Sequence, residues 1–344
     1  GPDRLPFILK LRRNEQGRVH VIGLLSEGDD VANLFPSARA YFLVDTVIPS
    51  AVVRFLLCIL PEKEAADIYT QIGFHKQGKA EFYRNFLDHL ARSSDLIQVA
   101  PGARGMVMLV FTQPSYPYVF KLIRDRFAPP KEVTRQQVID RYHMVKQHDR
   151  VGRMSDAWEF SYTAFPIDRF TDELLEELKT DAPSQIIIED DKLIIKHLFI
   201  ERRLEPLNLY LARANEDTAA RAIGEYGDAI HEIAAAGLFP GDLLPKNFGV
   251  TRYGRVIFYD YDEVVPLGEC NFRVLPPARY PEQELAAEPW YSVAPADVFP
   301  EEFPPFLFQN RVHRASFVRQ HGRLLDADYW KRLQQIVASG DFAD

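Results

Sequence analysis

Three polar residues in one short stretch constrain this chain more than any other feature of its sequence. Asp242 and Asn247 stand in the pattern Asp-x-x-x-x-Asn, and Asp260 follows them. Between Asn247 and Asp260, apolar residues flank a Tyr-Gly pair, which predicts a short β-hairpin. A hairpin brings its two ends together, so we expect the three polar side chains to lie close to one another.

These residue types suit phosphoryl transfer. A carboxylate can take the proton of an attacking hydroxyl, while an amide oxygen and a second carboxylate are hard ligands for the Mg²⁺ that binds ATP phosphates. The spacing is that of a protein-kinase catalytic loop, and Asp260 stands where kinases place the Asp of Asp-Phe-Gly. The stretch therefore predicts Asp242 as catalytic base, with Asn247 and Asp260 as metal ligands.

A second pattern, upstream, predicts a nucleotide loop. Glycines in residues 100–106 would let backbone N–H groups approach phosphate, and Lys121 in the strand at 118–123 would neutralise the α- and β-phosphates. The loop lacks a full G-x-G-x-x-G, so it is weak evidence without Lys121 and Asp242. The predicted nucleotide contacts are Ala100, Pro101, Gly102, Ala103, Arg104, Gly105, Met106, Lys121 and Lys246.

Kinases pair this lysine with an acid on a helix. The long helix predicted over 132–148 offers Glu132 and Asp140, and the sequence does not choose between them. Residues 201–204 stand where the hinge between two lobes belongs. Adenine bonds to backbone there, so we read their side chains as uninformative.

Composition excludes several classes of protein. A net charge of −8 argues against a nucleic-acid binder. The longest apolar run, 40–60, is broken by Asp45, Pro49 and Arg54, which argues against a membrane span. Cys58 and Cys270 form no disulfide framework and suit a reducing cytoplasm. The chain begins Gly-Pro without a Met, which indicates a fragment.

Periodicity predicts helices and strands along the whole chain. We expect strands at 5–11, 18–24, 41–44, 106–111 and 118–123, a hairpin over 186–200, and helices at 49–60, 64–72, 79–91, 132–148, 218–236 and 326–337. The predicted fold class is α+β, with a bilobal protein-kinase-like catalytic domain. The expected divisions are a remnant of a regulatory domain at 1–95, a kinase N-lobe at 96–200 and a C-lobe at 201–344.

Several long stretches resemble one family, isocitrate dehydrogenase kinase/phosphatase, a bifunctional bacterial enzyme. The matching stretches cover residues 101–112, 119–129, 148–154, 239–263 and 279–293. The resemblance extends over nearly all of the chain, although members carry a further N-terminal regulatory portion and more chain at the C-terminus.

The resemblance implies phosphorylation of a serine of isocitrate dehydrogenase with ATP and removal of that phosphate at the same nucleotide site. It also implies ATPase activity, control of flux between the Krebs cycle and the glyoxylate bypass, and a cytoplasmic location. The implied cofactors are ATP or ADP with Mg²⁺, or Mn²⁺ in its place, and AMP is the allosteric effector of the full-length family. The implied partners are isocitrate dehydrogenase and nucleotides, with no nucleic acid and no membrane.

The chain departs from ordinary protein kinases near its catalytic residues. Pro240-Gly241 replaces the His-Arg before the catalytic Asp, Lys246 directly precedes Asn247, and Asp262 replaces the Gly of Asp-Phe-Gly. If the chain is extended there, Asp260 and Asp262 point to the same side. We expect Asp262 to be a further metal ligand that helps activate water against a phosphoserine, while Glu263 reads as a loop acid.

Two other functions fit part of the pattern. Small-molecule phosphotransferases of the aminoglycoside or choline kinase type also use Asp-x-x-x-x-N and a later Asp-x-Asp, but they carry a His before the first Asp. A non-catalytic nucleotide-binding regulator would not consume ATP, whereas every residue type needed for turnover is present here.

Overall fold

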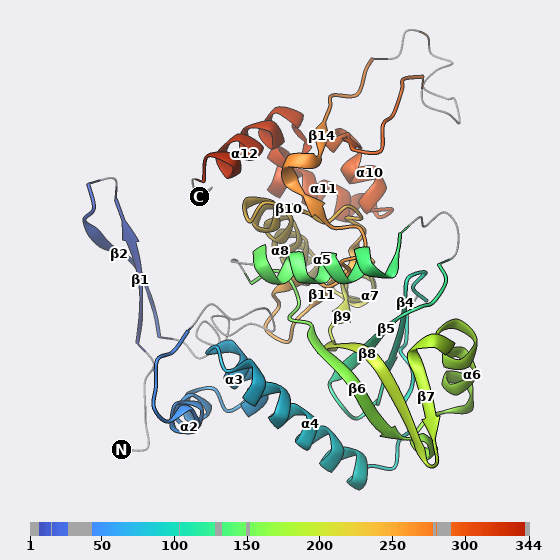
Figure 1. Ribbon diagram of the computed structural model, residues 1–344. Coiled ribbons are helices and arrows are strands. Elements are labelled where there is room, and N and C mark those ends of the chain that lie inside the picture. Colours follow the sequence, from blue (N-terminus) through green and yellow to red (C-terminus); the bar gives the residue numbers. More distant parts are fainter. Residues whose placement is uncertain are drawn as a thin grey trace. The chain divides into compact units, whose positions relative to one another are not determined.

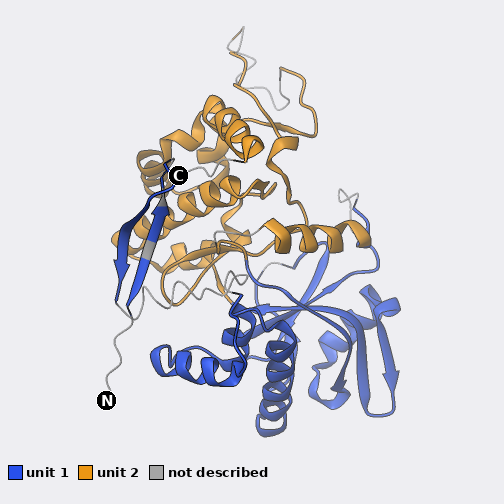
Figure 2. Ribbon diagram, turned by 60° about the vertical axis from the view of Figure 1, so that its left-hand side comes forward, with its two compact units in different colours: residues 1–135, 155–203 blue, residues 136–154, 204–344 orange. Residues whose placement is uncertain are grey.

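The computed structural model of the chain describes residues 7–14, 16–26, 43–102, 104–127, 133–148, 152–277, 280 and 290–340. The chain divides into two compact units, one of residues 1–135 and 155–203 and the other of residues 136–154 and 204–344 (Figure 2). Each unit contains both helices and paired strands, which confirms the predicted α+β class. Within the described ranges, no helix combines the length and apolarity that crossing a membrane requires.

The first unit is built on a six-stranded antiparallel sheet in the order β3-β4-β5-β8-β6, with β7 also pairing β8 (Figure 1). The predicted hairpin over 186–200 is confirmed as β7 and β8. The elements of this unit are β1 (Ile8–Arg13), β2 (Val19–Leu25), α2 (Pro49–Ile59), α3 (Ala65–Gln71), α4 (His75–Arg92), β3 (Gln98–Val99), β4 (Met108–Thr112), β5 (Tyr118–Ile123), β6 (Trp158–Pro166), α6 (Asp172–Asp181), β7 (Ile186–Glu189) and β8 (Lys192–Arg202).

One face of this sheet carries the apolar core. Side chains alternate along a strand, so Phe111 and Phe120, paired across β4 and β5, share a face, and Lys121 projects from the other. On the core face, Phe82 and Phe86 of α4 and Leu174 of α6 pack with the strand residues in one buried cluster. One face of the sheet therefore packs in the apolar core, and Lys121 lies on the opposite face.

Most predicted elements of residues 7–92 are present. The two N-terminal strands pair as β1 and β2, and the three helices are α2, α3 and α4, with α4 starting earlier than expected. The strand predicted at 41–44 is wrong at Leu43 and Val44, which belong to no strand; residues 41–42 lie outside the described part. The Val44 N–H instead donates to the Ile72 carbonyl at 3.1 Å, after the end of helix α3.

The second unit is mostly helical. Its elements are α5 (Arg135–His148), which starts at the unit boundary, β9 (Glu205–Pro206), α7 (Leu207–Arg213), α8 (Glu216–Ala235), β10 (Leu238–Phe239), β11 (Phe248–Val250), β12 (Val256–Phe258), β13 (Val265–Pro266), β14 (Asn271–Phe272), β15 (Asp297–Val298), α10 (Phe303–Leu307), α11 (Arg311–His321) and α12 (Ala327–Ser339). Short 3-10 turns lie at 167–169, 183–185, 245–247, 267–269, 300–302 and 322–325.

Helix α8 is the buried centre of the second unit. It begins at Asn215, whose side chain accepts a hydrogen bond from the Thr218 N–H, and the chain turns away at Gly237 with φ +86°. Buried residues recur on the face that packs against α11 and β12, including Ile223, Tyr226 and Ile230. This helix leads directly into the segment that bears Asp242.

Several elements were not foreseen. Strand β6 and helices α6, α7 and α11 have no counterpart in the sequence-based expectations. Their apolar residues mix with charged ones, as in α11, where only Ser316, Phe317 and His321 are buried. Local periodicity is weak in α11, so tertiary packing decides the conformation of that segment.

Candidate functional site

The segment around Asp242 forms a closed loop. The Asp242 Oδ1 accepts a hydrogen bond from the Leu244 N–H at 2.9 Å, and the Asn247 Nδ2 donates to the Asp242 carbonyl at 3.2 Å. A 3-10 turn over Pro245–Asn247 completes the loop. Asn247 is buried, whereas Asp242 is half-buried. The two residues that the sequence singled out are therefore held together by their own backbone, with the Asp242 carboxylate still accessible.

Gly241 explains one departure from the usual kinase loop. Its φ is +77°, and a Cβ there would lie 2.3 Å from the Glu263 carbonyl oxygen. Both the backbone conformation and the space exclude a side chain. The absence of that side chain lets the segment containing Glu263 approach the residue before Asp242.

The predicted hairpin between Asn247 and Asp260 is confirmed. Strands β11 and β12 pair with Phe248 opposite Phe258, and Gly254 turns the chain with φ +79°. After β12, the Tyr259 N–H donates to the Asn247 carbonyl at 3.1 Å. This bond fixes the residue before Asp260 beside the catalytic loop.

The Asp260–Asp262 segment packs against helix α5. Tyr261 is buried, and its ring meets the ring of Tyr142 edge-on at 4.9 Å between centroids. Arg141 donates a hydrogen bond to the Asp262 carbonyl. The chain turns at Asp262, because the Val264 N–H donates to the Tyr261 carbonyl at 3.3 Å. We expected the Asp260 and Asp262 side chains to point to the same side if the chain is extended there. Because the chain turns at Asp262, the side-chain alternation of a strand gives no support to that expectation.

The donor set fits Mg²⁺. The Asn247 NH₂ group is engaged by the Asp242 carbonyl, so its amide oxygen is the atom oriented for a cation. Asp260 and Asp262 supply half-buried carboxylates nearby in sequence. No group of three or more His, Cys, Asp or Glu side chains suited to a metal occurs among the described residues. A cation would therefore complete its oxygen shell with phosphate and water, as Mg²⁺ does.

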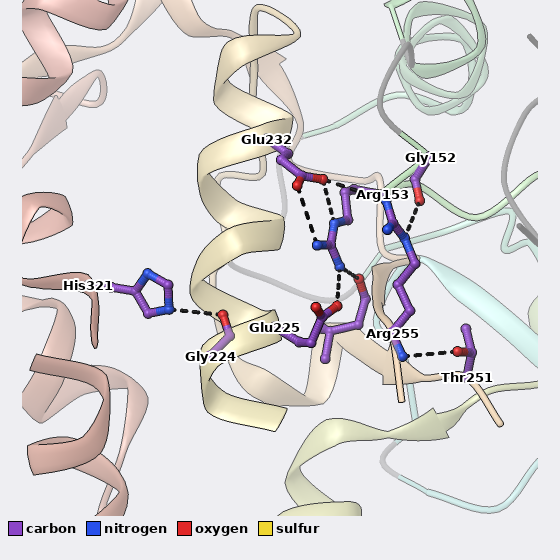
Figure 3. Close-up of polar contacts among 9 residues, drawn as sticks. Gly152, Arg153, Gly224, Glu225, Glu232, Thr251, Arg255 and His321 are labelled. Atoms are coloured by element: carbon purple, nitrogen blue, oxygen red, sulfur yellow. Dashed lines mark hydrogen bonds and ion pairs between the residues drawn. The ribbon is translucent and has the colours of Figure 1, made fainter. Parts of the chain in front are cut away.

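A buried arginine, Arg153, links the β11–β12 hairpin to helix α8 (Figure 3). Arg153 donates to Glu232 and Glu225 of α8 at 2.6 Å each, and to the Val256 carbonyl of β12 at 3.1 Å. Burial alone would lower the pKa of Arg153, but the two carboxylates outweigh burial and raise it. Arg255 lies 3.6 Å from the same Glu232 carboxylate. This ionic cluster ties α8 to the hairpin.

In the first unit, Lys121 pairs with an acid that the sequence analysis did not consider. The Lys121 Nζ lies 2.9 Å from the Glu201 carboxylate of β8, and their side chains are only 8% and 1% exposed. Asp140, one of the two expected partners, is exposed and accepts a hydrogen bond from Gln136 on its own helix. Glu132, the other, lies outside the described residues.

The glycine loop is a turn held at the edge of the same sheet. The Ala100 N–H donates to the Val110 carbonyl at 2.9 Å, and Gly102 has φ +122°, a value that side chains rarely allow. A Cβ on Gly105 would meet the Met108 carbonyl at 3.0 Å. The predicted contacts Pro101 and Met106 are exposed, and Ala103 lies outside the described residues.

Arg104 of this loop has a protein partner. It forms an ion pair with Glu173 of α6 at 2.6 Å and lies 3.7 Å from Glu177. Lys246, the other predicted nucleotide contact outside the loop, is half exposed and lies 4.0 Å from the Asp242 carboxylate. Of the two side chains, Lys246 is the better placed to meet a phosphate near the catalytic loop.

Sequence reasoning missed the polar residues around Glu201. Ser155 is buried and acts to lower the pKa of Glu201, and the neighbouring Asp156 accepts a hydrogen bond from the Trp158 indole at 3.1 Å. Glu201 was read as hinge backbone, and no spacing rule connects it to Lys121. A charged residue at the end of an apolar strand, Phe199-Ile200-Glu201, was the one signal that could have drawn attention to it.

Comparisons with known proteins show which family the chain resembles. A sequence model of the isocitrate dehydrogenase kinase/phosphatase kinase domain matches residues 95–344, and one of the regulatory domain of the same family matches residues 1–94.

Curated relatives carry the name isocitrate dehydrogenase kinase/phosphatase. The protein of Aromatoleum aromaticum is 52% identical over 344 residues, covering 100% of this chain and 58% of the relative. That of Pectobacterium carotovorum is 51% identical, with the same coverage. That of Colwellia psychrerythraea is 52% identical over 347 residues, covering 98% of this chain and 59% of the relative. The chain thus spans somewhat more than half the length of these relatives. With these matches, which together cover the whole chain, the chain belongs to the isocitrate dehydrogenase kinase/phosphatase family.

Proposed function

We propose that this chain transfers the γ-phosphate of ATP to a serine of isocitrate dehydrogenase and removes that phosphate at the same nucleotide site. The observation that carries the proposal is the closed Asp242–Asn247 loop, joined by one hairpin to Asp260 in the spacing of phosphotransferases. The relatives' names supply the protein substrate. The proposed division into a regulatory remnant, an N-lobe and a C-lobe follows the sequence-based boundaries.

In the forward reaction, Asp242 acts as the base. Its half-buried carboxylate takes the proton of the serine hydroxyl as the oxygen attacks the γ-phosphorus. The new O–P bond forms while the bond from the γ-phosphorus to the bridging oxygen breaks, and ADP leaves. Because Asp242 is held by the Leu244 N–H, its free oxygen keeps one direction.

Cationic groups balance the phosphate charge. Lys121 is the ammonium proposed for the α- and β-phosphates, and Lys246 the one proposed for the γ-phosphate. Glycines 102 and 105 leave backbone N–H groups of the loop accessible to phosphate. Asn247, Asp260 and Asp262 would hold Mg²⁺, which supplies positive charge to the phosphate oxygens when bound.

For the reverse reaction we propose that Asp262 takes a proton from water, which then attacks the phosphoserine phosphorus. The bond from phosphorus to the serine oxygen breaks as the water oxygen bonds to phosphorus, and the proton held by Asp262 passes to that serine oxygen. The products are phosphate and the free serine hydroxyl. AMP control is proposed for the longer family members.

An intact-mass experiment tests the proposal. The chain is mixed with Mg²⁺, ATP and purified isocitrate dehydrogenase, with the Asp242→Ala variant as control. A gain of one phosphate on the dehydrogenase that is absent with Asp242→Ala is the expected result. Absence of phosphate on the dehydrogenase would contradict the protein substrate, and absence of all ATP consumption would contradict the phosphotransferase assignment itself.

Phosphatase turnover is measured separately. Phosphorylated dehydrogenase is supplied with ADP and Mg²⁺, and release of inorganic phosphate is followed for the wild type and for Asp262→Asn. Asp262→Asn is expected to lose release and, because Asp262 is also proposed as a Mg²⁺ ligand, to slow the forward transfer by a smaller factor. Equal release by both proteins would contradict the role of Asp262.

A further inference from the structure

We propose that Glu201 is a positioning residue for Lys121, holding the ammonium that meets the ATP phosphates. The proposal rests on the proposed function, because it assigns Lys121 to ATP. Protein kinases generally hold this lysine with an acid from a helix. Here the acid comes from strand β8 of the same sheet as the lysine.

The sheet register explains why the two side chains meet. Across β5 and β8, Lys121 lies opposite Phe199 and Val119 lies opposite Glu201. Residues two apart on a strand share a face, so Lys121 and Glu201 are diagonal neighbours on one face. Long side chains reach each other across this diagonal, and their charged atoms come within 2.9 Å. The contact is thus built into two paired strands rather than into a separate helix.

Burial makes the ion pair between Lys121 and Glu201 important for both charges. Both side chains are almost fully removed from solvent, and a buried charge without a partner is strongly disfavoured. Burial raises the pKa of Glu201, while Lys121 and Ser155 act in the opposite direction. The buried ion pair thus holds the carboxylate of Glu201 against the Lys121 Nζ.

The end of β8 is also anchored from the opposite face of the sheet. Arg202, the next residue, lies over the ring of Tyr118 at 4.6 Å and pairs with Asp67 and Glu64 beside helix α3. The guanidinium is largely buried, and its acidic partners raise its pKa against the effect of burial. Glu201 thus lies on a strand end that is fixed on both faces, as a positioning residue requires.

The test compares Glu201→Gln, Glu201→Asp and a matched control. Glu159→Gln is the control, because Glu159 of β6 lies in the same sheet and holds a different base, His197, at 2.7 Å. The first readout is the KM for ATP and kcat in Mg²⁺-dependent transfer. We expect Glu201→Gln to raise the KM for ATP about tenfold, the loss typical of one charge-assisted hydrogen bond. Glu201→Asp should recover part of this loss, and Glu159→Gln should leave both constants unchanged.

A double variant separates positioning from general weakening. If Glu201 acts through Lys121, adding Glu201→Gln to Lys121→Met should cause no further loss of activity. Additive losses would overturn the proposal, as would an unchanged KM for ATP in Glu201→Gln. Urea unfolding of each variant shows whether a kinetic change merely follows lost stability.

A second readout does not depend on ATP turnover. An amine-selective acylating reagent labels lysines, and mass spectrometry reports the labelling rate of Lys121 against pH. Loss of the neighbouring carboxylate favours the neutral amine, so Lys121 should react severalfold faster in Glu201→Gln, with Glu201→Asp near the wild type. An unchanged labelling profile would overturn the proposal.

If the wild type fails to use ATP but the labelling shift occurs, the proposed function fails while the pairing stands. If Glu201→Gln does not fold, Glu201→Asp decides: its shorter carboxylate should raise the KM for ATP by less than tenfold, and a KM equal to that of the wild type would overturn the proposal.

Discussion

Lys246 places its ammonium 4.0 Å from the Asp242 carboxylate, within the loop that also contains Asn247. Its side chain is 49% exposed, so the pair contributes little to stability. Replacement Lys246→Met should therefore lower kcat of phosphoryl transfer by only about fivefold, the size of one exposed ionic contact. Steady-state kinetics at saturating ATP measures this effect. A loss as large as that of Asp242→Ala would show that Lys246 does more than balance charge.

Asp242 itself should matter far more. Asp242→Ala removes the proposed base and should reduce transfer to the dehydrogenase roughly 10²–10⁴-fold, the usual contribution of general base catalysis. Single-turnover transfer of labelled phosphate gives the rate, and far-UV circular dichroism confirms that the variant folds. A rate equal to the wild type would remove Asp242 from the mechanism.

Two glycines of helix α8 should respond oppositely to the same substitution. A Cβ at Gly227 would lie 2.2 Å from the His321 ring, which is buried and bonds to the Gly224 carbonyl at 2.9 Å. Gly227→Ala should therefore destabilise the protein by about 1–3 kcal/mol through overpacking. A Cβ at Gly224 meets only the end of the flexible Gln320 side chain. Gly224→Ala should be neutral or gain up to about 1 kcal/mol from helix propensity. Urea unfolding compares the two, and equal destabilisation would contradict the packing argument.

The ionic cluster behind the hairpin should be a major contributor to stability. Arg153→Met would leave Glu225 and Glu232 facing each other without their shared cation. We expect a loss of about 3 kcal/mol in the free energy of unfolding, at the lower end for broken buried pairs because the carboxylates remain partly solvated. Arg213→Met is the matched control, since Arg213 pairs with Glu205 at the surface and should change the free energy of unfolding far less than Arg153→Met. Similar losses in both variants would mean that the cluster is no stronger than a surface pair.

Asp95 should make stability depend on pH in the acid range. Burial alone would raise its pKa, but hydrogen bonds from the Ser115 N–H, the Ser115 hydroxyl and the Gln113 amide outweigh burial and lower it. A lowered pKa in the folded state means that the stabilisation is complete above the unfolded pKa of about 4 and is lost as pH falls through the lower folded value. Asp95→Asn should cost about 1 kcal/mol at pH 7, and the difference from the wild type should shrink toward pH 2.

The control for this prediction is Asp88→Asn. Asp88 pairs only with Arg92 on the surface of α4, where both side chains are mostly exposed. Asp88→Asn should change the free energy of unfolding by less than about 0.5 kcal/mol at every pH. Urea unfolding at several pH values measures both variants. A constant difference between wild type and Asp95→Asn from pH 7 to pH 2 would contradict the lowered pKa.

Local sequence patterns determined much of this protein. The hairpin of β11 and β12 follows from alternating apolar residues around Gly254, and α8 from its apolar stripe between the Asn215 cap and Gly237. The spacing of Asp242 and Asn247 was enough to indicate a catalytic loop, because one loop contains both. Such signals are readable because the interacting residues are close in sequence and each turn or cap has a specific residue requirement.

The tertiary structure alone decided which distant charges meet. Lys121 pairs with Glu201 because β5 and β8 adopt one register, and a shift by one residue would have turned Glu201 to the core face. Arg153 lies between α8 and β12, and Arg104 pairs with α6 instead of remaining free for phosphate. The sequence shows which charged residues need a partner, but only the packing of strands and helices brings one particular partner within reach. Sequence therefore determined the chemistry available to this protein, while strand register and helix packing decided how that chemistry is supported.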